Sequence, residues 1–222
     1  MAEGRQRIDK WLFYARVVKS RSLAAKLAQA GRVRINRDKA TQAADQVKPG
    51  DVLTITLDRP AVHNAYDAAT RDALVDALEL LRLDPTLTSA HLRGAGRSFC
   101  SGGDLSEFGL LADPVTAHQV RAQRSAALAV ARVADRLTVH LHGSCAGAGI
   151  ELAAFAGRVT ARAGTQIRLP EVAMGLIPGA GGTASLPPRI GRQRTAWLAL
   201  TGAAVDAATA MRWGLADELA PG

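Results

Sequence analysis

The sequence has few of the residues and segments that mark specialised classes of protein. Cysteine occurs only at positions 100 and 145, without a CxxC motif or a Cys/His spacing for metal, so two reduced, buried thiols are expected. No apolar run approaches the roughly 18 residues that span a bilayer, and the amphipathic N-terminus is not a signal peptide. We therefore expect a cytoplasmic protein that does not enter a membrane.

Lysine is absent after position 48, which makes the charge of the chain uneven. Residues 1–50 carry 12 Lys+Arg against 4 Asp+Glu, a net charge of +8, whereas residues 51–222 carry 16 of each and are neutral. Hydrophobic residues make up 48% of the 222 residues, which excludes a disordered chain. The asymmetry indicates a polyanion-binding module joined to a neutral globular body.

The basic segment has the pattern of a small α+β module. Apolar residues at helical spacing predict two helices, through Ile8, Trp11, Leu12 and Ala15 and through Leu23, Leu27 and Ala30. Ser20 is placed to cap the second helix, and Gly31 to end it. A short β segment is predicted at 33–36 and an alternating strand at 52–57, after a turn at 48–51.

Several ordered pieces of this segment resemble the S4 RNA-binding domain, and the small bacterial heat-shock ribosome-binding proteins most of all. They are RIDKWL at 7–12, Ser20-Arg21 with Ala24, GRVRIN at 31–36 and VKPGD at 47–51. The resemblance implies contacts with structured RNA, such as ribosomal RNA, through Lys10, Arg16, Lys19, Arg21, Arg32 and Arg34. Few aromatics are available for base stacking, so recognition by shape is expected, with a steep dependence on salt.

The neutral body alternates helical and strand patterns, which predicts an α/β fold. Helices are expected at 67–83, with Leu74, Leu78 and Leu81 on one face, and at 115–134. Strands are expected at 89–92 and 137–141. Two glycine-rich clusters, GAGRSFCSGGDL at 94–105 and HGSCAGAGIEL at 142–152, lie between these elements.

Neither glycine cluster fits a nucleotide-binding motif. The second lacks the βαβ context of a dinucleotide fingerprint, and Gly-Lys-Ser/Thr occurs nowhere. Glycine here would instead let backbone N–H groups approach a ligand closely, as in an oxyanion hole. The imidazoles of His140 and His142 share one strand face but have no acidic or cysteine partner nearby, so no metal site is predicted.

The body as a whole resembles the crotonase superfamily, and enoyl-CoA hydratases most of all. The matching pieces run in family order from about 52 to 219: ITLDRP at 55–60 with Asn64-Ala65, FCSGGD at 99–104, GAGIEL at 147–152, LPE at 169–171, GLIPGAGGT at 175–183 and LTG at 200–202. This implies a crotonase-like spiral ββα fold, at 56–222, after a small S4 domain at 1–55. The family's C-terminal helices would be missing, so we expect a fusion-like chain with an incomplete trimer interface.

The resemblance also implies the site residues. Backbone N–H groups of Cys100 and Ala148 would polarise the thioester carbonyl, while the Cys100 thiol is not expected to act as a nucleophile. The substrate would be bound by Gly102, Gly103, Asp104, Gly149, Pro178 and Gly179. No cofactor is expected other than the coenzyme A of the substrate.

Glu151 and Glu171 fall where hydratases keep their catalytic pair. Glu151 would accept a proton from water, and Glu171 would protonate the α-carbon, provided that an apolar pocket keeps one of them protonated. We therefore expect an enoyl-CoA hydratase-like lyase that acts on acyl-CoA in fatty acid metabolism. The alternatives are a crotonase isomerase or thioesterase, or an RNA- or ribosome-binding protein with a catalytically inert body.

Overall fold

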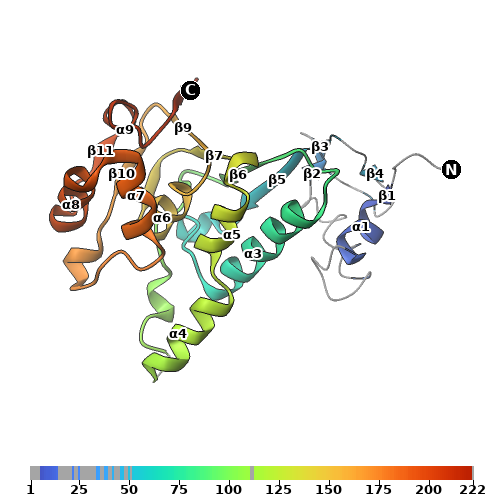
Figure 1. Ribbon diagram of the computed structural model, residues 1–222, viewed down its shortest axis with the longest axis horizontal. Helices are drawn as coiled ribbons and strands as arrows, with labels where there is room; N and C mark the ends of the chain where they lie inside the picture. The colour runs from blue at the N-terminus through green and yellow to red at the C-terminus, as the bar shows by residue number, and fades with distance from the viewer. Residues whose placement is uncertain are drawn as a thin grey trace.

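The computed structural model describes residues 6–14, 22, 25, 34–35, 38–39, 42, 46–47, 50, 52–110 and 113–221. A mixed sheet runs across the molecule (Figure 1). In the described part of the chain this sheet has seven strands, in the order β12 (Glu218–Ala220), β9 (Arg158–Arg162), β7 (Leu137–Leu141), β6 (Ser89–Gly94), β5 (Val52–Leu57), β2 (Arg34–Ile35) and β3 (Asp38–Lys39). The strands from β5 to β12 are parallel, and β2 and β3 are antiparallel.

Along the strands of this sheet, successive side chains alternate between a buried face and a polar face. Ala90 and Leu92 of β6 and Val139 of β7 are almost completely buried, whereas the residues between them are polar and partly exposed. This period of two is expected for a sheet with helices on only one of its faces. The predicted strands at 89–92 and 137–141 are confirmed.

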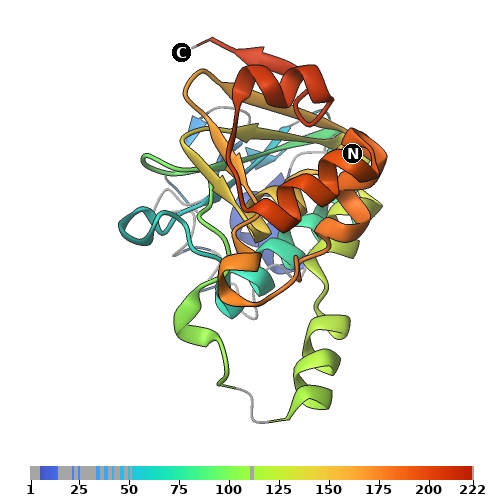
Figure 2. The ribbon, with the colours of Figure 1, turned by 90° about the vertical axis from the view of Figure 1, so that its left-hand side faces the viewer.

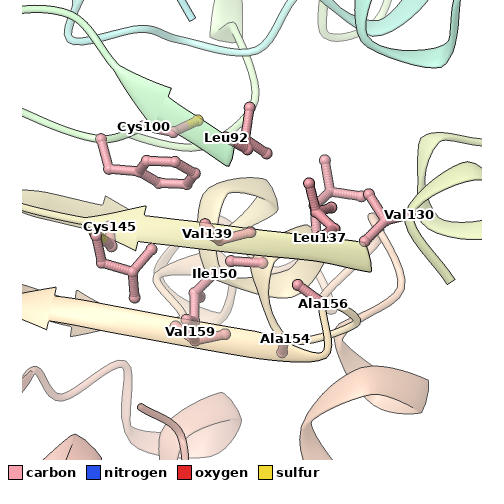
Figure 3. Close-up of a cluster of buried hydrophobic side chains, with 14 of the residues drawn as sticks. Leu92, Cys100, Val130, Leu137, Val139, Cys145, Ile150, Ala154, Ala156 and Val159 are labelled. Carbon is pink, nitrogen blue, oxygen red and sulfur yellow. The ribbon is translucent and has the colours of Figure 1, made fainter. Parts of the chain in front are cut away.

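Helices cover the buried face. They are α3 (Ala68–Leu83), α5 (Ala126–Arg132) and α6 (Ala148–Ala153). Asp67 caps α3 by accepting a hydrogen bond from the Thr70 N–H, and Leu74, Leu78 and Leu81 are buried, which confirms the helix predicted at 67–83. Figure 3 shows Val139, Val159 and Ile150, from β7, β9 and α6, in the core that results.

The single helix expected at 115–134 is wrong. The chain forms two helices, α4 (Pro114–Gln123) and α5, separated at Arg124 and Ser125. The Arg124 guanidinium bonds to Asp76 Oδ1 at 2.7 Å and to Asp72 of α3, and the Ser125 hydroxyl caps α5 at the Leu128 N–H. These tertiary bonds of Arg124 and the local cap at Ser125 break a helical pattern that is continuous in sequence. Helix α4 projects away from the body (Figure 2).

The C-terminal half adds a small sheet and three helices. The sheet joins β8 (Ser144–Ala146), β10 (Gln166–Arg168) and β11 (Val205–Asp206). The helices are α7 (Gly182–Ile190), α8 (Arg192–Thr201) and α9 (Ala207–Trp213). Short 3-10 turns lie at η1 (Pro60–Val62), η2 (Leu105–Glu107), η3 (Ala134–Arg136) and η4 (Glu171–Met174). No described helix is long and apolar enough to cross a membrane.

The N-terminal segment joins the same sheet and core. Helix α1 (Ile8–Tyr14) follows β1 (Gln6–Arg7), which pairs with β4 (Gln46–Val47). Ile8 and Leu12 are buried in one hydrophobic cluster with the core of the body. The predicted helix through Leu23, Leu27 and Ala30 lies outside the described residues. Strand β5, predicted at 52–57, pairs with β2 on one edge and β6 on the other, so the expected division at 55/56 falls within it.

Candidate active site

The two glycine-rich clusters meet beside Glu171. Gly147 has a φ of +48°, and a Cβ added there would lie 2.6 Å from Glu171 Oε1 and 3.6 Å from the Gly102 Cα. A Cβ on Gly102, whose φ is +106°, would lie 3.3 Å from the Ala146 carbonyl oxygen. Glycine is therefore required at both positions for conformation and for close approach of the two loops.

Some backbone N–H groups of the first loop donate hydrogen bonds within the protein, and others have no acceptor. The Cys100 N–H donates to the Ser144 carbonyl at 3.2 Å, in a β-bridge that pairs Cys100 with Cys145. The role of this N–H as a donor to the thioester carbonyl stays a prediction. Among the described residues the N–H groups of Gly102 and Gly103 have no acceptor, whereas Asp104 donates to the Tyr66 carbonyl at 3.0 Å. This loop therefore has two further N–H groups that could donate to a ligand.

The second predicted donor is available. Ala148 is the first residue of α6, after the N-cap Gly147, and its N–H has no acceptor in the described part of the chain. The first N–H groups of a helix lack intrahelical partners. Alanine adopts helical angles without strain, so Ala148 is well suited to this first helical position.

The carboxyl group of Glu151 is buried and held in place. Its side chain, from α6, is 1% exposed, and Oε2 accepts hydrogen bonds from the N–H groups of Ala180 and Gly182, both at 2.8 Å. Burial, together with the neighbouring Glu171, raises the pKa of Glu151 to about 7 against the two N–H bonds that lower it. Glu151 can therefore exchange a proton near neutral pH.

The carboxyl group of Glu171 is buried but incompletely bonded. Glu171 begins η4 and is 8% exposed. Its Oε2 has no hydrogen-bond partner among the described residues, and burial raises its pKa. A buried polar atom without a partner is costly in a folded protein, and such atoms concentrate where a ligand or water binds. The oxygen is thus positioned to bond a bound molecule.

A hydrogen-bond network that was not predicted from the sequence holds the first loop in place. The Asn64 amide donates to the carbonyls of Ala95 and Ser98 at 2.8 Å and of Phe99 at 3.1 Å. Arg59 Nη1 donates to Asp104 Oδ2 at 2.9 Å and forms an ion pair with Asp67. Both residues lie in the ITLDRP…NA motif, and this motif is the sequence feature from which their role could have been predicted.

The remaining predicted substrate contacts have structural roles in this geometry. Asp104 bonds to Arg59 and to the Ser106 N–H, and so anchors the loop. A Cβ on Gly149 would lie 2.8 Å from the Cys100 carbonyl oxygen, so Gly149 permits close packing of α6. Pro178 is buried and Gly179 exposed, immediately before the Ala180 N–H that binds Glu151.

Exposed apolar side chains follow Glu171 in the chain. Val172, Met174, Leu176 and Ile177 are all more than 40% exposed. They follow Glu171 directly in η4 and the turn after it. A cluster of this kind beside buried carboxyl groups suits a ligand with an apolar portion.

The two cysteines are free and buried, as predicted. Burial raises the pKa of the Cys100 thiol to about 11, which keeps it protonated and unreactive. In the described residues no three His, Cys, Asp or Glu side chains group together as metal ligands. The His140 imidazole contacts His91 at 2.7 Å and Thr160 at 2.9 Å, whereas His142 contacts the Gly96 carbonyl.

The predicted RNA contacts are only partly described. Lys10 is exposed on α1, and Arg34 lies in β2. Arg16, Lys19, Arg21 and Arg32 lie outside the described residues.

Comparison with known families confirms both predicted resemblances. The family described as enoyl-CoA hydratase/isomerase matches residues 48–222, and the S4 domain matches residues 6–53. The two matches overlap at 48–53, the segment that leads into β5.

Individual relatives point to the same family. The chain is 33% identical to the 2,3-dehydroadipyl-CoA hydratase of Escherichia coli over 77% of its own length and 66% of that protein. It is 37% identical to a probable enoyl-CoA hydratase of Rhodobacter capsulatus, over 77% and 65%. It is 31% identical to the mevalonyl-coenzyme A hydratase of Beauveria bassiana, over 77% and 64%. The chain thus spans no more than about two thirds of these curated relatives.

Solved structures share the fold. An enoyl-CoA hydratase/isomerase structure from Mycobacterium abscessus has a TM-score of 0.71 at 32% identity, covering 77% of this chain and 67% of that one. The enoyl-CoA hydratase of Thermoplasma volcanium has a TM-score of 0.71 at 28% identity, covering 86% and 73%. The crotonase fold predicted for the body is therefore confirmed.

Proposed function

Because the chain belongs to the enoyl-CoA hydratase/isomerase family, we propose that it adds water across the double bond of an α,β-unsaturated acyl-CoA thioester. The observation that carries this proposal is the pair of buried carboxyl groups. Glu151 is fixed by two backbone N–H groups, and Glu171 keeps one oxygen without a partner among the described residues.

The two carboxyl groups divide the proton transfers between them. A water molecule held by the pair loses a proton to Glu151 as its oxygen bonds to the β-carbon, and Glu171 gives its proton to the α-carbon. The net change is one water added to one double bond. Two interacting buried carboxyl groups favour a single shared proton near pH 7. The mechanism needs this state, because one carboxyl group must accept a proton while the other donates one.

The thioester oxygen gains negative charge as water adds. Backbone N–H groups of the first loop and of Ala148 would donate to that oxygen, and those of Gly102, Gly103 and Ala148 have no acceptor among the described residues. One donor of this kind is worth about 10²- to 10³-fold in rate. We assign no cofactor beyond the coenzyme A of the substrate, because hydration moves only water and protons.

Crotonyl-CoA hydration tests this function. The unaltered chain should remove the absorbance of the conjugated thioester, and Glu171→Gln should lower the rate by about 10²- to 10⁴-fold. Glu218→Gln, which replaces a glutamate on β12 that pairs with Arg158, is the matched control and should keep the activity. A folded protein without turnover would instead support the reading of an inert body that serves RNA binding.

We also propose that the S4 domain binds structured RNA through Lys10, Arg16, Lys19, Arg21, Arg32 and Arg34. The net charge of +8 in residues 1–50 supports this. RNA binding should weaken steeply with salt, and Arg21→Ala with Arg32→Ala should reduce both the affinity and the salt slope. The control is Arg121→Ala with Arg192→Ala, two exposed arginines on α4 and α8. Binding that ignores salt would refute the proposal.

A further inference from the structure

His63 has an uncommon backbone conformation beside the first loop. It is the C-cap of η1, and its φ of +53° and ψ of +36° lie in the left-handed region. Among the described residues other than glycine, only His63 and Asn64 have a positive φ. A side chain in this region carries strain, which persists where the surrounding contacts enforce it. The contacts of His63 therefore show what the strained turn holds in place.

The backbone of His63 is bonded to the first loop. The Ser101 N–H donates to the His63 carbonyl at 3.0 Å, and the Ser101 hydroxyl donates to the Val62 carbonyl at 3.4 Å. Ser101 immediately precedes Gly102 and Gly103, whose N–H groups have no acceptor among the described residues. The left-handed turn thus fixes the residue that leads into the two unbonded donors.

The His63 side chain is bonded to the loop a second time, at Ser98. Nδ1 lies 3.0 Å from Ser98 Oγ, and Arg97 Nη2 lies 3.4 Å from Nε2. A guanidinium only donates, so Nε2 accepts in this arrangement and Nδ1 carries the proton that it donates to Ser98 Oγ. This tautomer presents no basic nitrogen to Ser98, so the pair is not a nucleophile with its base. Its role is to hold the buried Ser98 in place.

We propose that His63 is a positioning residue, which aligns the unbonded N–H groups of the first loop with the thioester oxygen of the substrate. It grips the loop at Ser98 through its ring and at Ser101 through its carbonyl. Donors of this kind stabilise the developing charge only when they are held at the correct distance from it. The inference rests on the proposed hydration and adds the residue that sets the geometry of its donors.

Two substitutions that suit a left-handed backbone separate the ring from the turn. His63→Gly removes the ring and relieves the strain. His63→Asn also tolerates the left-handed region, and its amide N–H takes the place of Nδ1, so that the bond to Ser98 is kept. His118→Ala, at an exposed position on α4, is the control. Thermal melting checks the fold of each variant, and all three should melt close to the unaltered chain.

Steady-state kinetics with crotonyl-CoA is the first measurement. His63→Gly should lower kcat about 10-fold with KM nearly unchanged, whereas His63→Asn should stay within about twofold of the unaltered chain. The control should change neither constant. Loss of rate without loss of melting temperature, together with recovery in His63→Asn, is a result that a merely structural role would not give.

The second measurement reports the polarised carbonyl directly. The thioester p-dimethylaminocinnamoyl-CoA absorbs at longer wavelength when hydrogen bonds draw electron density onto its carbonyl oxygen. The unaltered chain and His63→Asn should produce this shift on binding, and His63→Gly should produce a smaller one. An equal shift or an equal kcat in His63→Gly and the unaltered chain would overturn the inference and leave the hydration intact. A raised KM with an unchanged kcat would also overturn it, and an unaltered chain with neither turnover nor shift would overturn the proposed function as well.

Discussion

Glu151 combines two opposing influences on one carboxyl group. Burial at 1% exposure favours the protonated form, whereas the N–H groups of Ala180 and Gly182 favour the ionised form. Burial prevails, because the pKa is raised to about 7. The folded state therefore binds a proton on Glu151 over a pH range in which the unfolded state has released it.

This difference makes folding stability depend on pH. The stabilising effect of the protonated group is fully present below pH 4.5, the ordinary value, and is lost as pH rises through about 7. Relative to Glu151→Gln, which cannot ionise, the unfolding free energy of the unaltered chain should fall by about 2 kcal/mol between pH 5 and pH 8. Urea unfolding of both proteins at the two pH values measures this. An unchanged difference would contradict the raised pKa.

Gly147 is the glycine at which an added methyl group would contact the Glu171 carboxyl group. Gly147→Ala places a Cβ 2.6 Å from Glu171 Oε1 at a φ of +48°. Gly164→Ala is the matched control, because its φ is +81° and nothing lies within 4 Å of the added Cβ. The control should cost about 1 kcal/mol and keep hydratase activity. Gly147→Ala should cost more and abolish activity, as checked by thermal melting and crotonyl-CoA turnover.

At this scale the sequence indicates the two carboxyl groups of the site but not its unbonded N–H groups. Glu151 and Glu171 could be proposed because their side chains stand in distinct motifs, and the structure buries both. The unbonded N–H groups of the first loop could not be predicted, because every residue of FCSGGD carries an N–H. Which of them are bonded depends on contacts with distant segments, such as the bridge between Cys100 and Cys145, two residues 45 positions apart in sequence.

At the scale of elements, the loop that carries Gly103 depends on one arginine. Arg59 contacts the Ala65 carbonyl, Asp67 and Asp104, and so links η1, the start of α3 and the loop. Arg59→Lys keeps the charge but loses the planar fork that reaches all three groups. It does not touch the substrate in this account and acts as a positioning residue.

Arg59→Lys should lower kcat by about 10-fold and leave KM nearly unchanged, because the loop donor acts mainly on the charge that develops during reaction. Arg82→Lys, in an exposed ion pair with Glu79, is the control and should change neither constant. Steady-state kinetics with crotonyl-CoA separates the two parameters. A rise in KM with an unchanged kcat would show that Arg59 serves binding instead.

Helices were predicted correctly where the local sequence pattern determines them, and wrongly where contacts with distant residues determine where a helix ends. The helix at 68–83 follows from its own apolar spacing and its Asp67 cap. The break between α4 and α5 could not be predicted, since it depends on Asp72 and Asp76 of α3, about 50 residues earlier in the chain.

At the scale of the whole molecule, the two matched families share one strand. From the sequence, an S4 domain at 1–55 and a separate crotonase-like domain at 56–222 are expected. The structure instead pairs β5 with both β2 and β6, and buries Ile8 and Leu12 in the cluster that forms the core of the body. A shared strand and a shared core couple the unfolding of the two parts.

We therefore expect a single thermal transition. Trp197→Phe with Trp213→Phe leaves Trp11, in α1, as the sole tryptophan of the chain. In that variant Trp11 fluorescence and far-UV circular dichroism should report the same midpoint temperature. A lower midpoint for Trp11 fluorescence would show that the N-terminal part unfolds on its own.

The central claim is that Glu151 and Glu171 direct one water molecule to the β-carbon of an enoyl thioester. The most direct measurement is mass spectrometry of the products formed from crotonyl-CoA in ¹⁸O-labelled water. The account predicts 3-hydroxybutyryl-CoA with the label in its hydroxyl group, and loss of this product in Glu151→Gln and in Glu171→Gln. Label in free crotonate would reveal thioester hydrolysis instead, and a folded chain that leaves crotonyl-CoA unlabelled and intact would contradict the claim.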